Sequence, residues 1–115
     1  TYGDVVVFKW PRDESQNFVK RVIGLPGDRV RVELGTVFVN DDPVEEPYVE
    51  YTLRQTITER VVEQGTYYVM GDNRAQSDDS RHWGTVPFDN VIGKIAVVYW
   101  PVGRIAAMEA MLPAL

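Results

Sequence analysis

Arg29-Val30-Arg31-Val32-Glu33-Leu34 alternates polar and apolar residues with a period of two, the pattern of a β-strand that buries one face and exposes the other. Gly35 and Thr36 separate this stretch from the apolar run Val37-Phe38-Val39, and Asn40-Asp41-Asp42-Pro43 has the composition of a further turn. Two strand-like runs joined by so short a connection predict a β-hairpin, or two hairpins in series.

The same strand-like composition recurs along most of the chain, where runs of β-branched and aromatic residues are bounded by Gly, Pro and polar residues. Further strands are expected at residues 4–10, 18–23, 51–57, 66–70 and 91–100. Residues 12–17 and 71–84 are polar and predict loops, whereas the Ala-, Met- and Glu-rich residues 105–111 favour a short helix. We therefore predict an all-β domain whose antiparallel sheets form a coiled, partly open barrel-like fold, with a short C-terminal helix.

The length of 115 residues predicts a single domain, residues 1–115. Within it, the acidic, Thr-rich residues 44–64 predict an exposed and variable excursion, and residues 102–115 form a tail. The net charge of −5 argues against a nucleic-acid partner, and the sequence has no cysteine for disulfides or thiolate chemistry. The longest apolar run, residues 95–100, is far shorter than the roughly 20 residues that span a bilayer. The chain is therefore expected to be soluble, or to be the soluble part of something longer.

Three stretches together resemble the conserved boxes of bacterial type I signal peptidases, in the order that the family has them. They are Gly3-Asp4-Val5-Val6-Val7-Phe8, Lys20-Arg21-Val22-Ile23-Gly24-Leu25-Pro26-Gly27-Asp28 and Gly71-Asp72-Asn73-Arg74-Ala75-Gln76-Ser77-Asp78-Asp79-Ser80-Arg81-His82-Trp83-Gly84. The similarity runs from about residue 3 to about residue 101. The resemblance implies a serine/lysine endopeptidase that removes N-terminal signal peptides from exported preproteins, without a metal or a cofactor. It also implies a membrane-anchored parent with this domain on the extracytoplasmic face of the cytoplasmic membrane.

The nucleophile of that family lies in a Ser-Met-x-Pro motif that follows a membrane anchor. The chain has three serines, Ser15, Ser77 and Ser80, and none stands in such a motif. Ala110-Met111-Leu112-Pro113 has the spacing of the motif with alanine in the serine position. We interpret it as a chance match in an Ala-rich tail, because the family order puts the motif upstream; the alternatives are a displaced or a disabled motif. The chain by itself is expected to have no peptidase activity.

Lys20 matches the family's general base. A lysine amine accepts a proton only when neutral, and its reference pKa of about 10.4 keeps it charged at neutral pH unless burial lowers that pKa. In a strand, Lys20 shares a face with Phe18 and Val22, while Val19 and Arg21 point the other way. This apolar setting favours a desolvated base; the alternative is an edge-strand lysine whose amine reaches water.

Other site residues follow from the resemblance. Ser77 matches the serine that hydrogen-bonds and orients the lysine, the alternative being a loop serine that caps a turn. Asp79 and Arg81 match a pair that supports the site by stiffening the loop. The positions that match the walls of the substrate pockets for small residues are Val7, Phe18 and Val19. The alternative for each of these three residues is a place in the hydrophobic core.

Several polar or aromatic residues are of types found in functional sites, but a structural role is the simpler interpretation. His82 is the only histidine, and neither a catalytic triad nor a metal site can be built around it. Asp28 lies in a tight turn, where Asp commonly accepts hydrogen bonds from backbone amides. Asp72, Asn73, Arg74 and Ser80 are interpreted as loop-fixing groups. Trp10, Trp83 and Trp100 suit a lipid interface, although at least two of them are expected in the core.

The expected partners are signal peptides of exported preproteins and a membrane surface. An alternative from another class is a non-catalytic relative that binds extended exported or pilin-type chains. The absence of the serine motif favours that alternative, and the presence of Lys20 with Ser77 opposes it. The self-cleaving repressors, which share the serine/lysine chemistry, are set aside because the third stretch is too specific and DNA-binding helices are not evident.

Overall fold

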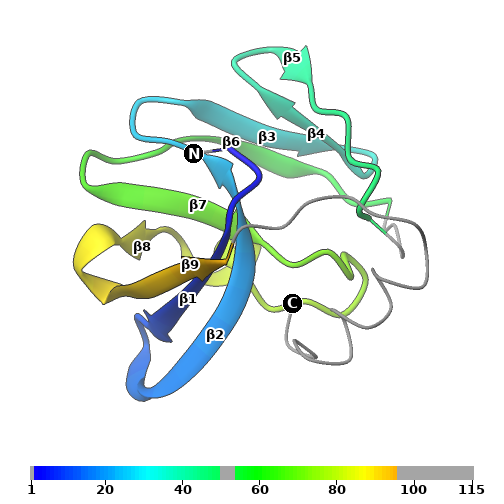
Figure 1. The fold of residues 1–115 in the computed structure, drawn as a ribbon. Helices are drawn as coiled ribbons and strands as arrows, with labels where there is room; N and C mark the ends of the chain where they lie inside the picture. The colour runs from blue at the N-terminus through cyan, green and yellow to red at the C-terminus, as the bar shows by residue number, and fades with distance from the viewer. Residues whose placement is uncertain (1, 50–53, 96–115) are drawn as a thin grey trace.

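The computed structural model describes residues 2–49 and 54–95, which fold into two antiparallel β-sheets (Figure 1). The strands are β1 (Val5–Trp10), β2 (Asp13–Gly24), β3 (Arg29–Glu33), β4 (Thr36–Val39), β5 (Asp42–Pro43), β6 (Ile57–Val61), β7 (Thr66–Met70), β8 (Val86–Pro87) and β9 (Val91–Ile95). The helical turns are α1 (Ser80–Trp83) and η1 (Phe88–Asn90). The five-stranded sheet has the order β8-β7-β2-β1-β9 and the four-stranded sheet the order β5-β4-β3-β6. The predicted all-β fold of antiparallel sheets is confirmed, and in the part of the chain described here the sheets do not close into a barrel.

The hairpin predicted from residues 29–39 is β3 and β4, with Val30 opposite Val39 and Val32 opposite Val37. Its connection has positive φ angles at Leu34 (48°) and Gly35 (88°), as a two-residue type I′ turn requires. The buried valines of this hairpin pack in a cluster between the two sheets. That cluster contains Ile23, Val30, Val32, Val37, Val62, Tyr68 and Met70.

The curved strand β2 belongs to the five-stranded sheet (Figure 1). Its side chains contribute to a hydrophobic cluster on each face of that sheet. Ile23 joins the cluster between the sheets, while its neighbour Val22 joins a second cluster on the opposite face. Gly24 ends β2 where the chain passes close to the four-stranded sheet: a Cβ there would lie 2.8 Å from Val30 Cγ2. Only glycine fits this close approach without displacing the core.

Two of the predicted boundaries are wrong, and both errors concern polar strand residues. Residues 13–17 were expected to form a loop, yet β2 begins at Asp13 and pairs with β1. Of the strand expected at residues 51–57, residues 51–53 lie outside the described residues and residues 54–56 are not in a strand; β6 begins at Ile57 and pairs with β3. Most residues of these segments are exposed, so their polarity reflects solvent contact and does not reveal the backbone pairing.

The other expectations are met in part. The segment expected to be a strand at residues 91–100 forms β9 as far as Ile95, and the rest lies outside the described residues. The expected loop at residues 71–84 contains the single turn α1. The helix predicted at residues 105–111 and the tail 102–115 also lie outside the described residues. Among the residues that are described, no helix has the length and apolarity needed to cross a membrane.

Candidate active site

Lys20 lies near the middle of the five-stranded sheet, on β2 between β1 and β7. The register places Lys20 opposite Val6 and Phe18 opposite Phe8, so these four side chains share one face. Val22, two residues further along β2, packs on the same side with Val6 and Phe8. Lys20 is only 6% exposed. The apolar face expected around this lysine is therefore the one that the structure shows.

The amine of Lys20 is held by a serine and lies beside an aromatic ring. Its Nζ donates to Ser77 Oγ at 3.0 Å and lies 5.6 Å from the centroid of the Phe18 ring. Burial lowers the pKa of Lys20 below its ordinary value of 10.5, and the nearby carboxylates of Asp79 and Asp78 oppose this without reversing it. Desolvation penalises the ammonium form, so the site favours a neutral amine that can accept a proton.

Ser77 is packed against the backbone of Gly71, the residue that follows β7. A Cβ on Gly71 would lie 2.0 Å from Ser77 Oγ and 3.5 Å from Lys20 Nζ. The absence of a side chain at this position is therefore what lets the serine hydroxyl reach the amine. Gly71 begins the third of the family-like stretches, but its role could not be predicted from the sequence, because the contact depends on the path of the loop.

Asp79 and Arg81 form a buried, bidentate ion pair beneath the loop that carries Ser77. Arg81 Nε donates to Asp79 Oδ1 and Nη2 to Oδ2, both at 2.8 Å, and the Asp79 side chain is fully buried. Burial alone would raise the pKa of Asp79, but the hydrogen bonds and charge of Arg81 outweigh it and the pKa is lowered. Asp79 also accepts from Gly71 N at 3.0 Å, and Arg81 Nη2 donates to Ser77 O at 3.3 Å.

Two further buried ion pairs hold the same loop. Arg21 donates to both oxygens of Asp72, at 2.9 and 2.7 Å. Arg74 donates to both oxygens of Glu46, at 2.9 and 2.5 Å. Asp72 and Arg74 thus fix the loop, as their sequence context suggested, whereas the burial of Glu46 was missed because the segment around it is acidic.

The three residues that match pocket walls do not converge on one face. Phe18 lies on the face of Lys20, whereas Val7 and Val19 are cross-strand partners, and alternation puts both on the opposite face. Phe18 stacks on Trp10, with ring centroids 4.9 Å apart, and meets Trp83 edge-on at 6.2 Å. All three predicted pocket residues are half-buried, and their contact with substrate stays a prediction.

The contacts of the remaining candidates, His82 and Asp28, indicate structural roles. His82 Nδ1 lies 3.4 Å from Asp78 Oδ1, and the histidine side chain is 52% exposed. Asp28 accepts from Leu25 N at 2.8 Å and from Asn40 Nδ2 at 2.9 Å, so it fixes the turn after β2 as expected. Among residues 2–49 and 54–95, no group of His, Cys, Asp or Glu is arranged to hold a metal ion.

The candidate site is thus a buried lysine amine that is bonded to a serine hydroxyl, beside a loop that ion pairs hold in place. Residues 1–100 match the family described as signal peptidase, peptidase S26. The chain is 40% identical over 114 residues to a signal peptidase I of Leptolyngbya laminosa, covering 92% of this chain and 56% of that protein. It is 36% identical over 117 residues to a signal peptidase I of Bacillus caldolyticus, covering 90% and 63%.

The structural comparison agrees. A crystal structure of a signal peptidase I from Enterococcus faecalis V583 matches with a TM-score of 0.72 at 34% sequence identity, covering 84% of this chain and 96% of that chain. The chain therefore belongs to the signal peptidase family, peptidase S26. It spans between 51% and 63% of the length of the curated relatives compared with it here.

Proposed function

We propose that these residues form the catalytic domain of a signal peptidase I, an endopeptidase that removes N-terminal signal peptides from exported preproteins after small residues. The observation that supports this proposal most directly is the Lys20 amine, which is buried on an apolar face and bonded to Ser77. A neutral amine is the form that a general base needs; burial lowers the cost of reaching that form, and the hydroxyl partner fixes the orientation of the amine.

In the proposed reaction, Lys20 Nζ accepts the proton of a serine hydroxyl as that oxygen attacks the scissile carbonyl. The resulting ammonium then donates a proton to the leaving amine, and in the second step the neutral amine activates water to release the acyl group. Ser77 keeps Nζ oriented throughout, and Asp79 with Arg81 holds the loop that carries Ser77. The nucleophilic serine belongs to a Ser-Met-x-Pro motif that these 115 residues do not contain, so the chain by itself is proposed to be inactive.

The proposed substrate is an extended signal peptide with small side chains near the cleaved bond. Phe18 and the pair Val7 and Val19 would line shallow pockets, which select small residues by excluding large ones. The proposed location is the extracytoplasmic face of the cytoplasmic membrane, where the exported chain emerges. The acidic net charge gives no support to a nucleic-acid partner, and the proposed chemistry needs no cofactor.

A second candidate function is a non-catalytic module that binds extended exported or pilin-type chains. The absence of a Ser-Met-x-Pro motif from these residues favours it. The Lys20–Ser77 contact argues against it, because a binding module gains nothing from a desolvated amine.

One experiment separates the two candidates. The parent gene product, with any residues that precede Thr1, is incubated with a preprotein in detergent, and the products are identified by mass spectrometry. Cleavage at a signal-peptide junction is expected. Binding of the preprotein without cleavage would overturn the peptidase proposal and leave the binding module. The 115-residue chain is assayed in parallel, and cleavage by it would contradict the proposed inactivity.

A further inference from the structure

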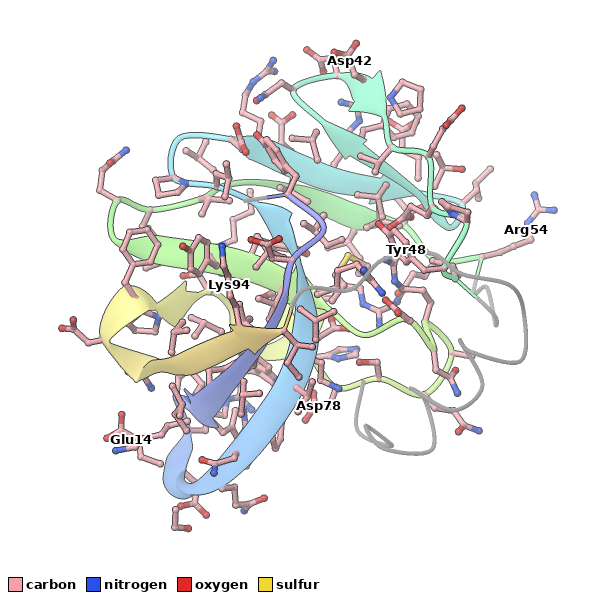
Figure 2. All side chains as sticks on the ribbon, in the orientation of Figure 1. Glu14, Asp42, Tyr48, Arg54, Asp78 and Lys94 are labelled. Atoms are coloured by element: carbon pink, nitrogen blue, oxygen red, sulfur yellow. The ribbon has the colours of Figure 1, made fainter. Side chains whose placement is uncertain are left out.

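Two side chains of the segment that follows β5 reach the surroundings of the site: Glu46 pairs with Arg74 in the loop that follows β7, and Tyr48 packs on Arg21 of β2. The Glu46 side chain is only 10% exposed and that of its partner Arg74 only 4%. Tyr48 Oη donates to Glu46 Oε2 at 3.2 Å, and Figure 2 shows Tyr48 on the side of this segment that faces the middle of the molecule. A bidentate, buried Arg–carboxylate pair fixes distance and orientation together.

Arg74, which Glu46 holds in place, also binds the backbone of Gly71. Its Nε donates to the carbonyl oxygen of Gly71 at 2.7 Å, while the Gly71 amide donates to Asp79 Oδ2 at 3.0 Å. Gly71 is thus held at both its N–H and its C=O. Because Ser77 packs directly on Gly71, a fixed Gly71 fixes the serine that bonds Lys20.

Tyr48 adds a second connection to the same place. Its ring lies 4.0 Å from the guanidinium carbon of Arg21, which neighbours Lys20 in sequence and is paired with Asp72, the neighbour of Gly71. Arg21, which flanks Lys20, and Asp72, which flanks Gly71, therefore form an ion pair that contacts Tyr48. Stability alone does not call for such pairs, since apolar residues of similar volume serve as well or better in a protein interior.

We propose that Glu46 is a positioning residue for the Lys20–Ser77 pair, acting through Arg74 and the backbone of Gly71. The inference rests on the proposed role of Lys20 and extends it to a segment that carries none of the three family-like stretches. Glu46 touches neither substrate nor the reacting atoms; it holds in place the backbone of Gly71, against which Ser77 packs.

The test measures the pKa of the Lys20 amine in the 115-residue chain by NMR. The sequence has three lysines, Lys9, Lys20 and Lys94, so the signals are assigned with single Lys→Met variants. In Glu46→Met, the backbone of Gly71 is no longer fixed, so Ser77 loses its support and water reaches the Lys20 amine. The pKa of Lys20 is then expected to rise towards its ordinary value. Loss of a negative charge acting only through space would lower that pKa, so the direction of the shift identifies the mechanism. The matched control is Glu45→Met, because Glu45 is exposed, and it is expected to leave the Lys20 pKa unchanged.

A second variant guards against misfolding. Glu46→Met with Arg74→Met replaces the buried ion pair by apolar side chains of similar length, which is often neutral for stability, and it too releases the carbonyl of Gly71. The same rise of the Lys20 pKa is expected, with cooperative unfolding retained in a circular dichroism melt. If the pKa of Lys20 is lowered in the unchanged chain but stays the same or falls in both variants, the inference about Glu46 is overturned alone. An ordinary Lys20 pKa in the unchanged chain would overturn the proposed general base and this inference together.

Discussion

Lys20 Nζ and Ser77 Oγ lie 3.0 Å apart although 57 positions separate the two residues in the chain. The contact joins the buried half of β2 to a loop that three ion pairs hold in place. Each partner is polar; Lys20 is buried on an apolar face, and Ser77 is half-buried against the backbone of Gly71. Such an arrangement costs stability, and it is useful to a protein that needs a neutral amine at a fixed point.

Lys20→Met is expected to abolish signal-peptide cleavage by the parent gene product. Methionine has nearly the length of lysine and suits the apolar face, so the domain should stay folded while the proton acceptor is lost. General-base catalysis contributes about 10²- to 10⁴-fold to rates, and kcat should fall at least that far. Lys94→Met is the matched control, because the Lys94 side chain is 65% exposed, and it should leave turnover unchanged. Near-normal turnover of Lys20→Met would show that another group is the base.

Ser77→Ala is expected to lower kcat while leaving measurable activity. The amine of Lys20 remains buried in this variant but loses the hydroxyl that orients it. Ser15→Ala provides the comparison, since the Ser15 hydroxyl is exposed and donates to Asp13 Oδ1 at 2.6 Å, away from Lys20. Equal kcat values for Ser77→Ala and the unchanged protein would remove the orienting role from Ser77.

Gly71→Ala tests the close packing behind Ser77. The new Cβ would lie 2.0 Å from Ser77 Oγ and 2.5 Å from Ser77 Cβ, so the serine must move. Overpacking of this kind costs about 1–3 kcal/mol of unfolding free energy, measurable by urea denaturation. Gly93→Ala is the control, because a Cβ at Gly93 meets nothing within 4 Å. Adding Ser77→Gly to Gly71→Ala should restore stability without restoring activity, and failure to regain stability would place the strain elsewhere.

The elements that sequence predicted well are those in which side chains alternate between core and solvent. The hairpin of residues 29–39 is one case, and the position of Lys20 beside Phe18 and Val22 is another. Period-two alternation also places Val19 on the other face of the sheet from Lys20, and the structure shows this. The grouping of Val19 with Phe18 came from family resemblance alone, and the two side chains lie on different faces.

What sequence did not predict depends on long-range contacts of polar groups. The polar sequence of Asp13 and its neighbours predicts a loop, because this part of β2 is exposed, although the backbone of β2 pairs with β1 there. Glu46 reads as a solvated acid among other acids, and its burial follows from Arg74, 28 positions later. Neither property is encoded in local periodicity, since each is decided by where a distant segment passes.

Asp79→Asn is expected to destabilise the domain strongly. Asparagine has the shape of aspartate but leaves the Arg81 guanidinium as an unpaired buried charge, and breaking a buried pair costs about 3–5 kcal/mol. Asp41→Asn removes a partner of exposed arginines and should have a much smaller effect. The pKa of Asp79 is lowered by folding from its ordinary 3.8, so its contribution to stability is complete above that value and is lost as the pH falls through the folded-state pKa. Urea denaturation at neutral and acidic pH checks both statements, and equal losses in the two variants would contradict them.

The lowered pKa of Lys20 predicts a pH dependence of both stability and activity. Between the folded-state pKa and the ordinary value of 10.5, the unfolded chain binds a proton that the folded chain does not. The contribution of Lys20 to the free energy of unfolding therefore rises with pH across that window, and it is least favourable below it.

Tyr2 and Tyr68, whose pKa values are raised to about 12, act in the opposite sense above their ordinary value of 10.0. They are present in Lys20→Met as well, so the difference in unfolding free energy between the two chains isolates the lysine. That difference should shift in favour of the unchanged chain as the pH rises across the window. The kcat/KM of the parent gene product should increase as the pH rises through the folded-state pKa of Lys20 and level off above it, because only the neutral amine accepts a proton. A stability difference that is constant from neutral pH to about pH 10 would mean that the lysine is not desolvated, and the acid limb of the activity profile would then belong to another group.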